Sequence, residues 1–229
     1  MKIRAQRWRG EYWLRASLAS AGVAAILVCA MFAAPPPSGA ADDRPVVLFL
    51  GTSLTAGYGL PSAQAFPALI QGKIDRAGLR YRVVNAGVSG DTSAGGVRRI
   101  DWLLQSPVSV LVLELGANDM LRGLDHGAMR TNLVKIIERT RAAYPKAKLL
   151  IAGMRAAPNL GADYRRKFES IYLELANIYD APLIPFLLQD VAAKPGLNQL
   201  DGIHPTAQGH SLVAERVWGK LLPLLAKPS

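Results

Sequence analysis

The chain has 229 residues, of which 50% are hydrophobic and 19% charged, a balance typical of a globular protein with one sizeable core. Its only cysteine is Cys29, which excludes an intramolecular disulfide and a cysteine-rich metal cluster. The formal net charge is +10, but five of the 27 Lys and Arg and one of the 17 Asp and Glu lie in residues 1–40. The remaining 22 basic and 16 acidic residues form no basic block, so no nucleic-acid partner is expected.

Residues 1–40 have the pattern of a secretory signal peptide. Five basic residues precede an uncharged apolar run over 16–34, and three prolines and several small residues follow. This order predicts export and cleavage near Ala40 or Ala41. An uncleaved anchor is the alternative, because the run is about long enough to span a bilayer. We expect an exported protein, periplasmic or secreted, without stable membrane insertion after cleavage.

From residue 46 onward, apolar runs alternate with amphipathic stretches. The expected strands are 46–50, 81–85, 109–115, 148–152 and 183–184, and the expected helices are 64–77, one that carries Val97 to Leu104, 129–144, 164–179 and 205–225. Such alternation predicts βαβ units around a parallel sheet, and right-handed crossovers then give a three-layer α/β/α sandwich of doubly wound type. No linker divides residues 41–229, so we expect a single domain.

The first expected strand leads directly to a candidate nucleophile. Five apolar residues over 46–50 are followed by Gly51 and, two positions later, by Ser53. Open α/β sheets bind their ligands just beyond the carboxyl ends of strands, where this serine lies. An ordinary strand-to-helix loop would have the same local composition, so the stretch alone favours neither interpretation.

Later loops supply the partners that a serine nucleophile needs. A serine hydroxyl requires a base to remove its proton, and His204 can serve as that base. Asp201, three residues earlier, can hold one ring nitrogen and stabilise the imidazolium. The oxyanion of a tetrahedral intermediate needs preorganised donors; candidates are the Ser53 backbone N–H, a glycine N–H within 87–91 and the Asn118 side chain.

Four segments resemble the sequence blocks of the SGNH (GDSL) hydrolases, in order and over nearly the whole mature chain. They are Gly51-Thr52-Ser53-Leu54, the run over 85–92, Gly116-Ala117-Asn118-Asp119, and Asp201-Gly202-Ile203-His204-Pro205. The closest resemblance is to the periplasmic multifunctional thioesterase/lysophospholipase/arylesterase branch. It implies a flavodoxin-like five-stranded parallel sheet of order 2-1-3-4-5. It also implies Ser53 as nucleophile, Asp201 and His204 as the rest of the triad, and Ser53, Gly90 and Asn118 as oxyanion donors.

Thr52 departs from this family pattern, because the first block usually reads Gly-Asp-Ser-Leu. A hydroxyl therefore replaces a carboxylate beside the nucleophile. Since Asp201 is the acid of the triad, we expect the chemistry to survive. On this reasoning, Thr52→Asp should change activity by less than about tenfold, a barrier change of ~1.4 kcal/mol.

Other polar residues have simpler interpretations. Asp91 and Asp119 are expected to brace their loops, and Glu114, inside a strand, to be a buried hydrogen-bonding residue. His126 and His210 are expected to be structural or solvent-facing.

Apolar residues in two loops are candidate substrate contacts, with core packing as the alternative interpretation; we expect at least one of these loops to touch substrate. They follow the third and fourth strands and comprise Met120, Leu121, Leu124, Pro158 and Leu160. We expect an esterase or thioesterase that acts on small fatty-acyl, aryl or lysophospholipid esters through an acyl-serine intermediate, without metal or cofactor. The alternatives are a carbohydrate O-acetylesterase and a non-catalytic lipid-binding module of the same fold.

Overall fold

The computed structural model describes residues 42–225; the predicted signal peptide over 1–40 lies outside them. The strands are β1 Val46–Gly51, β2 Arg82–Gly87, β3 Val108–Glu114, β4 Lys148–Ala152 and β5 Leu183–Ile184. The helices are α1 Ser53–Ala56, α2 Phe66–Arg76, α3 Ser93–Leu103, α4 Ala117–Leu121, α5 His126–Ala143, α6 Ala162–Tyr179 and α7 Ala207–Leu221. Short 3₁₀ helices occupy Ser62–Gln64, Pro158–Leu160 and Leu222–Leu224.

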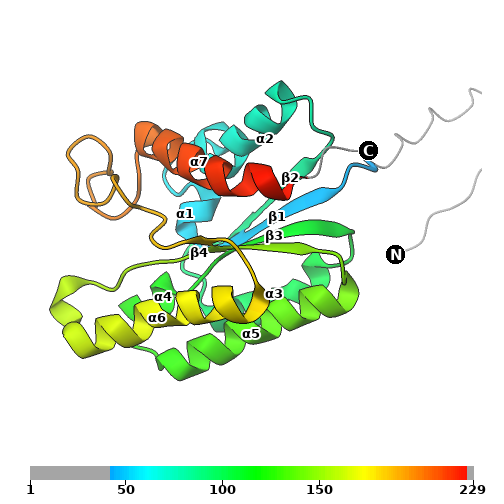
Figure 1. Ribbon diagram of the computed structural model, residues 1–229. Helices are drawn as coiled ribbons and strands as arrows, with labels where there is room; N and C mark the ends of the chain where they lie inside the picture. Colours follow the sequence, from blue (N-terminus) through cyan, green and yellow to red (C-terminus); the bar gives the residue numbers. More distant parts are fainter. Residues whose placement is uncertain (1–41, 226–229) are drawn as a thin grey trace, which may run out of the picture. The chain divides into compact units, whose positions relative to one another are not determined.

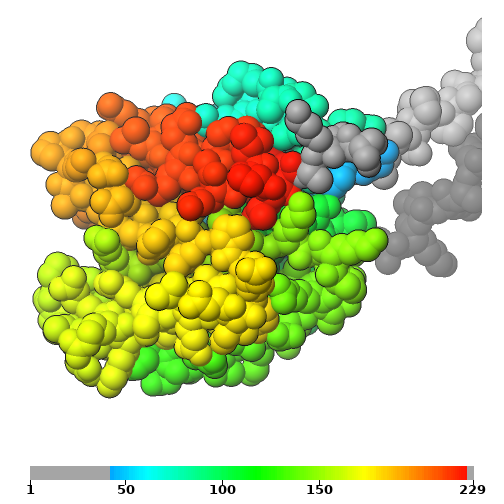
Figure 2. Space-filling view, in the orientation of Figure 1, coloured from blue at the N-terminus to red at the C-terminus, as the bar shows by residue number. Residues whose placement is uncertain are grey.

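The five strands form one parallel sheet of order β2-β1-β3-β4-β5, which confirms the predicted fold. Helices α2 and α7 cover one face, and α3, α5 and α6 cover the other (Figure 1). The space-filling view shows α7 in red above α6 in yellow, packed as outer layers of the same body (Figure 2). Because both faces are covered, the central strands need no alternation of apolar and polar residues.

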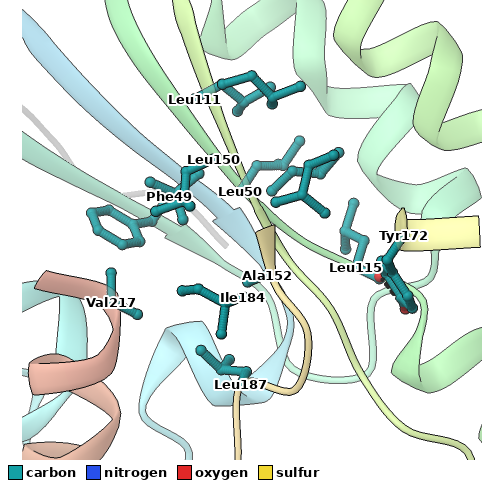
Figure 3. Packing of buried hydrophobic residues seen from close by; sticks show 14 of the residues in the cluster. Phe49, Leu50, Leu111, Leu115, Leu150, Ala152, Tyr172, Ile184, Leu187 and Val217 are labelled. Carbon is teal, nitrogen blue, oxygen red and sulfur yellow. Dashed lines mark hydrogen bonds between the residues drawn. The ribbon is translucent and has the colours of Figure 1, made fainter. Parts of the chain in front are cut away.

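The core is formed by the central strands and the inner faces of the helices. All six residues of β1 are buried. Phe49 faces Val217 of α7, whereas Leu115 lies beside Tyr172 of α6, on the opposite side of the sheet (Figure 3). The Tyr172 hydroxyl donates to the Leu115 carbonyl over 3.0 Å, so even this buried phenol has a partner.

Local side chains explain where the helix boundaries differ from those expected. Helix α2 begins at Phe66 rather than at residue 64. Pro67 lies in its first turn, where the backbone N–H that proline lacks would have no partner within the helix. Helix α5 begins three residues before the predicted start, because Asp125 caps it by accepting from the Ala128 N–H over 2.7 Å. No helix within residues 42–225 is both long enough and apolar enough to cross a membrane.

Candidate active site

The register of the sheet brings three loops together at its carboxyl edge. Gly51, the last residue of β1, is paired with Gly87 of β2 and with Glu114 of β3. The loops that carry Ser53, Gly90 and Asn118 therefore leave the sheet at the same level. In an open parallel sheet, this edge is where ligands bind.

Ser53 is the first residue of the four-residue helix α1. Thr52 is the N-cap of this helix in an extended conformation, and Gly57 ends it in the left-handed region with a φ of 75°. The first N–H groups of a helix have no partner within the helix, so the Ser53 N–H remains available to a ligand. The Ser53 Oγ lies 2.9 Å from His204 Nε2.

Asp201 and His204 complete a relay that starts at Ser53. His204 Nδ1 lies 2.6 Å from Asp201 Oδ2, while Asp201 Oδ1 accepts from the backbone N–H groups of Ile203 and His204 over 2.9 and 3.0 Å. These hydrogen bonds, with that from the His204 ring the largest cause, lower the pKa of Asp201 to about 2. The carboxylate is therefore ionised at neutral pH and holds the ring with Nε2 directed at the serine.

A second set of contacts fixes the histidine loop against the first loop. The backbone N–H of Gln199 donates to the His204 carbonyl over 2.7 Å. The side-chain amide of Gln199 donates to the carbonyls of Tyr58 and Pro205 over 2.7 and 3.0 Å. The Tyr58 ring lies against the His204 ring, with centroids 4.6 Å apart. Segments 141 residues apart in the chain are thereby joined beside His204.

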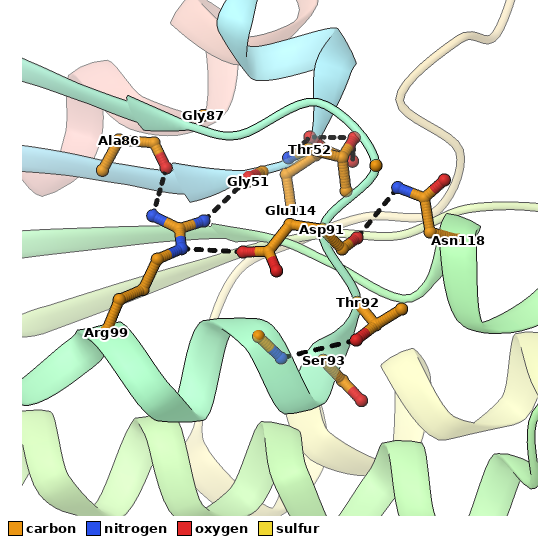
Figure 4. Close-up of polar contacts among 12 residues, drawn as sticks. Gly51, Thr52, Ala86, Gly87, Asp91, Thr92, Ser93, Arg99, Glu114 and Asn118 are labelled. Atoms are coloured by element: carbon orange, nitrogen blue, oxygen red, sulfur yellow. Dashed lines mark hydrogen bonds and ion pairs between the residues drawn. The ribbon is translucent and has the colours of Figure 1, made fainter.

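The three expected oxyanion donors lie around the same space. Gly90 adopts a φ of 78°, a left-handed conformation that favours glycine, and its carbonyl accepts from Arg122 over 2.6 Å. The Asn118 amide donates to the Asp91 carbonyl over 2.8 Å (Figure 4), which fixes the side chain beside the Gly90 turn. Ser53, Gly90 and Asn118 all line one cleft.

This cleft has a volume of about 330 Å³ and is mostly apolar. It is lined by Thr52, Ser53, Leu54, Tyr58, Ser89, Gly90, Ala117, Asn118, Met120, Leu121, Met154, Leu188, Ile203 and His204. Of the five candidate substrate contacts, Met120 and Leu121 line it, whereas Leu124, Pro158 and Leu160 are not among its lining residues.

Several lining residues were not predicted as contacts, among them Tyr58, Ser89, Leu188 and Ile203. Ile203 lies within the histidine motif and Tyr58 lies shortly after the serine motif, so their closeness to these motifs could have identified them. Ser89 lies beside Gly90 and offers the same clue. Leu188 lies in an irregular segment after β5, where the sequence carries no comparable pattern.

Glu114 and Thr52 interact directly beneath Ser53. The N–H and the hydroxyl of Thr52 donate to the Glu114 carboxylate over 2.8 and 3.1 Å (Figure 4). The Thr55 hydroxyl donates to the same carboxylate over 2.8 Å. Burial raises the pKa of Glu114, and the hydrogen bonds from the two threonines oppose that rise. A Cβ at Gly51 would overlap Thr55 Oγ1 and Glu114 Oε2, so only glycine allows this carboxylate its place.

The remaining polar residues brace the structure. Asp119 accepts from both the N–H and the hydroxyl of Ser93, and Asp91 pairs with Arg99 over 2.7 Å. His210 is buried and its Nδ1 accepts from the Phe66 N–H over 3.2 Å. Within residues 42–225, no group of His, Cys, Asp and Glu side chains is arranged to hold a metal ion.

A doubly wound parallel sheet with a Ser-His-Asp relay at its strand ends defines a class of serine hydrolases. Residues 49–212 match the GDSL-like lipase/acylhydrolase family, and the chain therefore belongs to this family. The protein is an enzyme that hydrolyses ester bonds.

Named relatives fit this assignment. Esterase TesA of Pseudomonas aeruginosa is 39% identical over 180 residues, which cover 78% of this chain and 89% of TesA. Thioesterase 1/protease 1/lysophospholipase L1 of Escherichia coli K12 is 39% identical over 181 residues, or 78% of this chain and 84% of the relative. The crystal structure of the psychrotrophic esterase EstA from Pseudoalteromonas sp., inhibited by monoethylphosphonate, is 33% identical with a TM-score of 0.74 and covers 80% of this chain and 99% of EstA.

Proposed function

We propose that this protein hydrolyses fatty-acyl, aryl or lysophospholipid esters and thioesters through an acyl-serine intermediate. The observation that carries the proposal is the relay of 2.6 Å from Asp201 to His204 and 2.9 Å from His204 to Ser53 at the wall of an apolar cleft. Both distances are within the reach required for proton transfer.

The first half of the reaction acylates the serine. His204 Nε2 takes the Ser53 proton as Oγ attacks the acyl carbonyl carbon, and Asp201 stabilises the imidazolium. The oxyanion accepts hydrogen bonds from the N–H groups of Ser53 and Gly90 and from the Asn118 amide; such donors are each worth ~3 kcal/mol of barrier. His204 then protonates the leaving alcohol or thiol as its bond to the acyl carbon breaks.

In the second half, water replaces the leaving group. His204 removes a proton from this water as its oxygen attacks the acyl-serine carbonyl. The same donors stabilise the second oxyanion, and protonation of Ser53 Oγ releases the carboxylic acid. The groups required are all supplied by the chain itself.

The lining of the cleft supports an apolar acyl group as the preferred substrate. Met120, Leu121 and Met154 present unbranched or branched apolar side chains next to Ser53. Each methylene buried against such a surface contributes ~0.8 kcal/mol, so binding should strengthen with chain length until the cleft is filled.

A serine-directed fluorophosphonate combined with p-nitrophenyl esters from acetyl to palmitoyl tests this proposal. Wild-type protein should be labelled and should hydrolyse medium-chain esters, and Ser53→Ala should lose both properties while unfolding at the same temperature. Folded wild-type protein that neither reacts with the probe nor cleaves any ester would be a binding module instead. Activity confined to the acetyl ester would indicate an acetylesterase.

We also propose that the protein is exported and cleaved near Ala40, leaving the single domain over 41–229. The basic start and apolar run of residues 1–40 support this proposal. Sequencing the N-terminus of the protein recovered from the periplasm or medium checks it. A chain that starts at Met1 in the membrane fraction would instead indicate an anchor.

A further inference from the structure

Arg99 of α3 joins three separate segments at the edge of the sheet (Figure 4). Its Nε donates to Asp91 Oδ2 over 2.7 Å, its Nη1 to the Ala86 carbonyl over 2.5 Å and its Nη2 to the Gly51 carbonyl over 3.0 Å. The side chains of Arg99 and Asp91 are only 20% and 10% exposed. This guanidinium is therefore a largely buried junction rather than a surface charge.

Two partners of Arg99 lie within two positions of residues of the proposed chemistry. Gly51 lies two positions before Ser53, and Asp91 directly follows Gly90. The Gly51 carbonyl also accepts from the Val88 N–H over 3.0 Å, which ties the same peptide to the loop after β2. The segments that carry Ser53 and Gly90 are thus hydrogen-bonded to one side chain.

The peptide that links Gly51 to Thr52 is held at both of its polar ends. Arg99 donates to its carbonyl over 3.0 Å, and its N–H donates to Glu114 Oε2 over 2.8 Å. Because a peptide unit is planar and stiff, fixing both ends fixes its rotation. The direction in which the chain enters Ser53 is set accordingly.

Asp91 extends this network to the third proposed donor. Its carboxylate accepts from Arg99, while its backbone carbonyl accepts from the Asn118 amide over 2.8 Å. Ser53 and Gly90 lie within two residues of hydrogen-bond partners of the Arg99 guanidinium, and Asn118 is hydrogen-bonded to one of these partners, Asp91. Arg99 itself is not among the residues that line the cleft.

We propose that Arg99 is a positioning residue that sets the spacing of the oxyanion donors of Ser53, Gly90 and Asn118 without touching substrate. This inference rests on the proposed function of the site. Only a guanidinium offers donors in a planar fork that can meet three acceptors at once, so lysine is not an equivalent replacement. A residue with a merely structural role would change stability but not the turnover of the folded enzyme.

The test compares Arg99→Met and Arg99→Lys with Arg98→Met, an adjacent and exposed arginine on the same helix. Steady-state kinetics on p-nitrophenyl butyrate should show kcat reduced about 100-fold in Arg99→Met with KM within about threefold, the effect of displacing reacting groups by an ångström. Arg99→Lys should lie in between, and Arg98→Met should match wild type within about twofold.

Chemical rescue gives a second readout. Millimolar guanidinium should raise kcat of Arg99→Ala several-fold and leave Ser53→Ala inactive. If Arg99→Met does not fold, Arg99→Lys is compared with wild type instead, because lysine keeps the positive charge but lacks the planar guanidinium. Folded Arg99 variants with wild-type kcat would overturn the inference and leave the proposed function intact.

Structural comparison keeps the two proposals separate. An inactive wild type would contradict the proposed function, and crystal structures of wild type and Arg99→Lys would then decide the inference alone. We expect the Gly51–Thr52 peptide and the Gly90 turn to shift relative to each other in Arg99→Lys. Unchanged positions of both would overturn the positioning role.

Discussion

Thr52 occupies the position at which the family motif carries an aspartate, and its contacts show what a hydroxyl does there. It is 1% exposed, and both its N–H and its hydroxyl donate to Glu114. A carboxylate removed from water needs donors, not a second negative charge. Threonine therefore allows one buried acid, Glu114, to remain beneath Ser53 with its hydrogen bonds made.

This contact reverses our expectation for Thr52→Asp. Two carboxyl groups would face each other in a buried site where burial already raises the pKa of Glu114, and such pairs retain a proton. Because the pKa of Glu114 is higher in the folded than in the unfolded state, the free energy of unfolding is greatest below the ordinary Glu pKa of 4.5. It decreases as the pH rises through the pKa of the folded state. We now expect activity at pH 7 to fall by more than about tenfold, a barrier increase above ~1.4 kcal/mol.

Thr52→Asn is the matched control, because it has the same shape as aspartate but a neutral amide that can donate to Glu114. Urea denaturation between pH 4 and 8 should show the two variants converging in acid and separating toward neutral pH. Parallel pH profiles for the two variants would contradict the expected repulsion.

At the scale of elements, α2 and α7 are joined by a histidine rather than by apolar contact alone. Ala65 at the N-cap of α2 makes no side-chain cap, and His210 of α7 supplies the acceptor instead, taking the Phe66 N–H over 3.2 Å. Its ring also stacks on Phe66 at 6.1 Å. Burial and, to a smaller extent, the charge of His204 lower the pKa of His210 to about 4.

This lowered pKa predicts acid sensitivity. The folded state disfavours the proton that the unfolded chain binds below the ordinary value of 6.5. The free energy of unfolding is therefore highest above pH 6.5, and it decreases by up to ~3 kcal/mol as the pH falls toward 4. Urea denaturation across this range should show the decline in wild type and a weaker one in His210→Gln.

His126→Gln provides the matched control, since it removes one imidazole from the half-buried first position of α5. If His210→Gln and His126→Gln had the same pH dependence as each other, the assignment of the acid sensitivity to His210 would fail.

At the scale of the whole molecule, the cleft exists only because loops from distant parts of the chain converge. Leu121 follows β3, Met154 follows β4, Leu188 follows β5, and Ile203 precedes α7, yet all four line the same space. Under the proposed function, we therefore expect preference for acyl chain length to depend on the assembled edge. No single loop supplies all four of these side chains.

Truncating Leu121, which is 57% exposed at this cleft, should reduce binding of long acyl chains selectively. We expect Leu121→Ala to lower kcat/KM for a decanoyl ester about fivefold and to leave the acetyl ester within about twofold, because only the longer chain reaches the lost apolar surface. Leu212→Ala, a similarly exposed leucine of α7 outside the lining, is the control. Equal losses on both esters would indicate a folding effect.

Much of the architecture was predictable because it depends on local patterns. The apolar run before Gly51 predicts a strand covered on both faces, and the alternation of such runs with amphipathic stretches predicts the parallel sheet. Four short motifs in a fixed order predicted the family. Their residues Ser53, Asn118, Asp201 and His204 line or border one cleft, because parallel strands place their carboxyl ends at one edge.

Contacts between segments far apart in sequence were decided only by the tertiary structure. Arg99 has the appearance of a solvated helix residue in the sequence, but the fold closes it over Gly51, 48 residues away. Glu114 could be predicted as buried, but its partnership with Thr52, 62 residues earlier, depends on strand register. Side-chain type and spacing therefore determined which chemistry is present, whereas packing between distant segments decided how its groups are held.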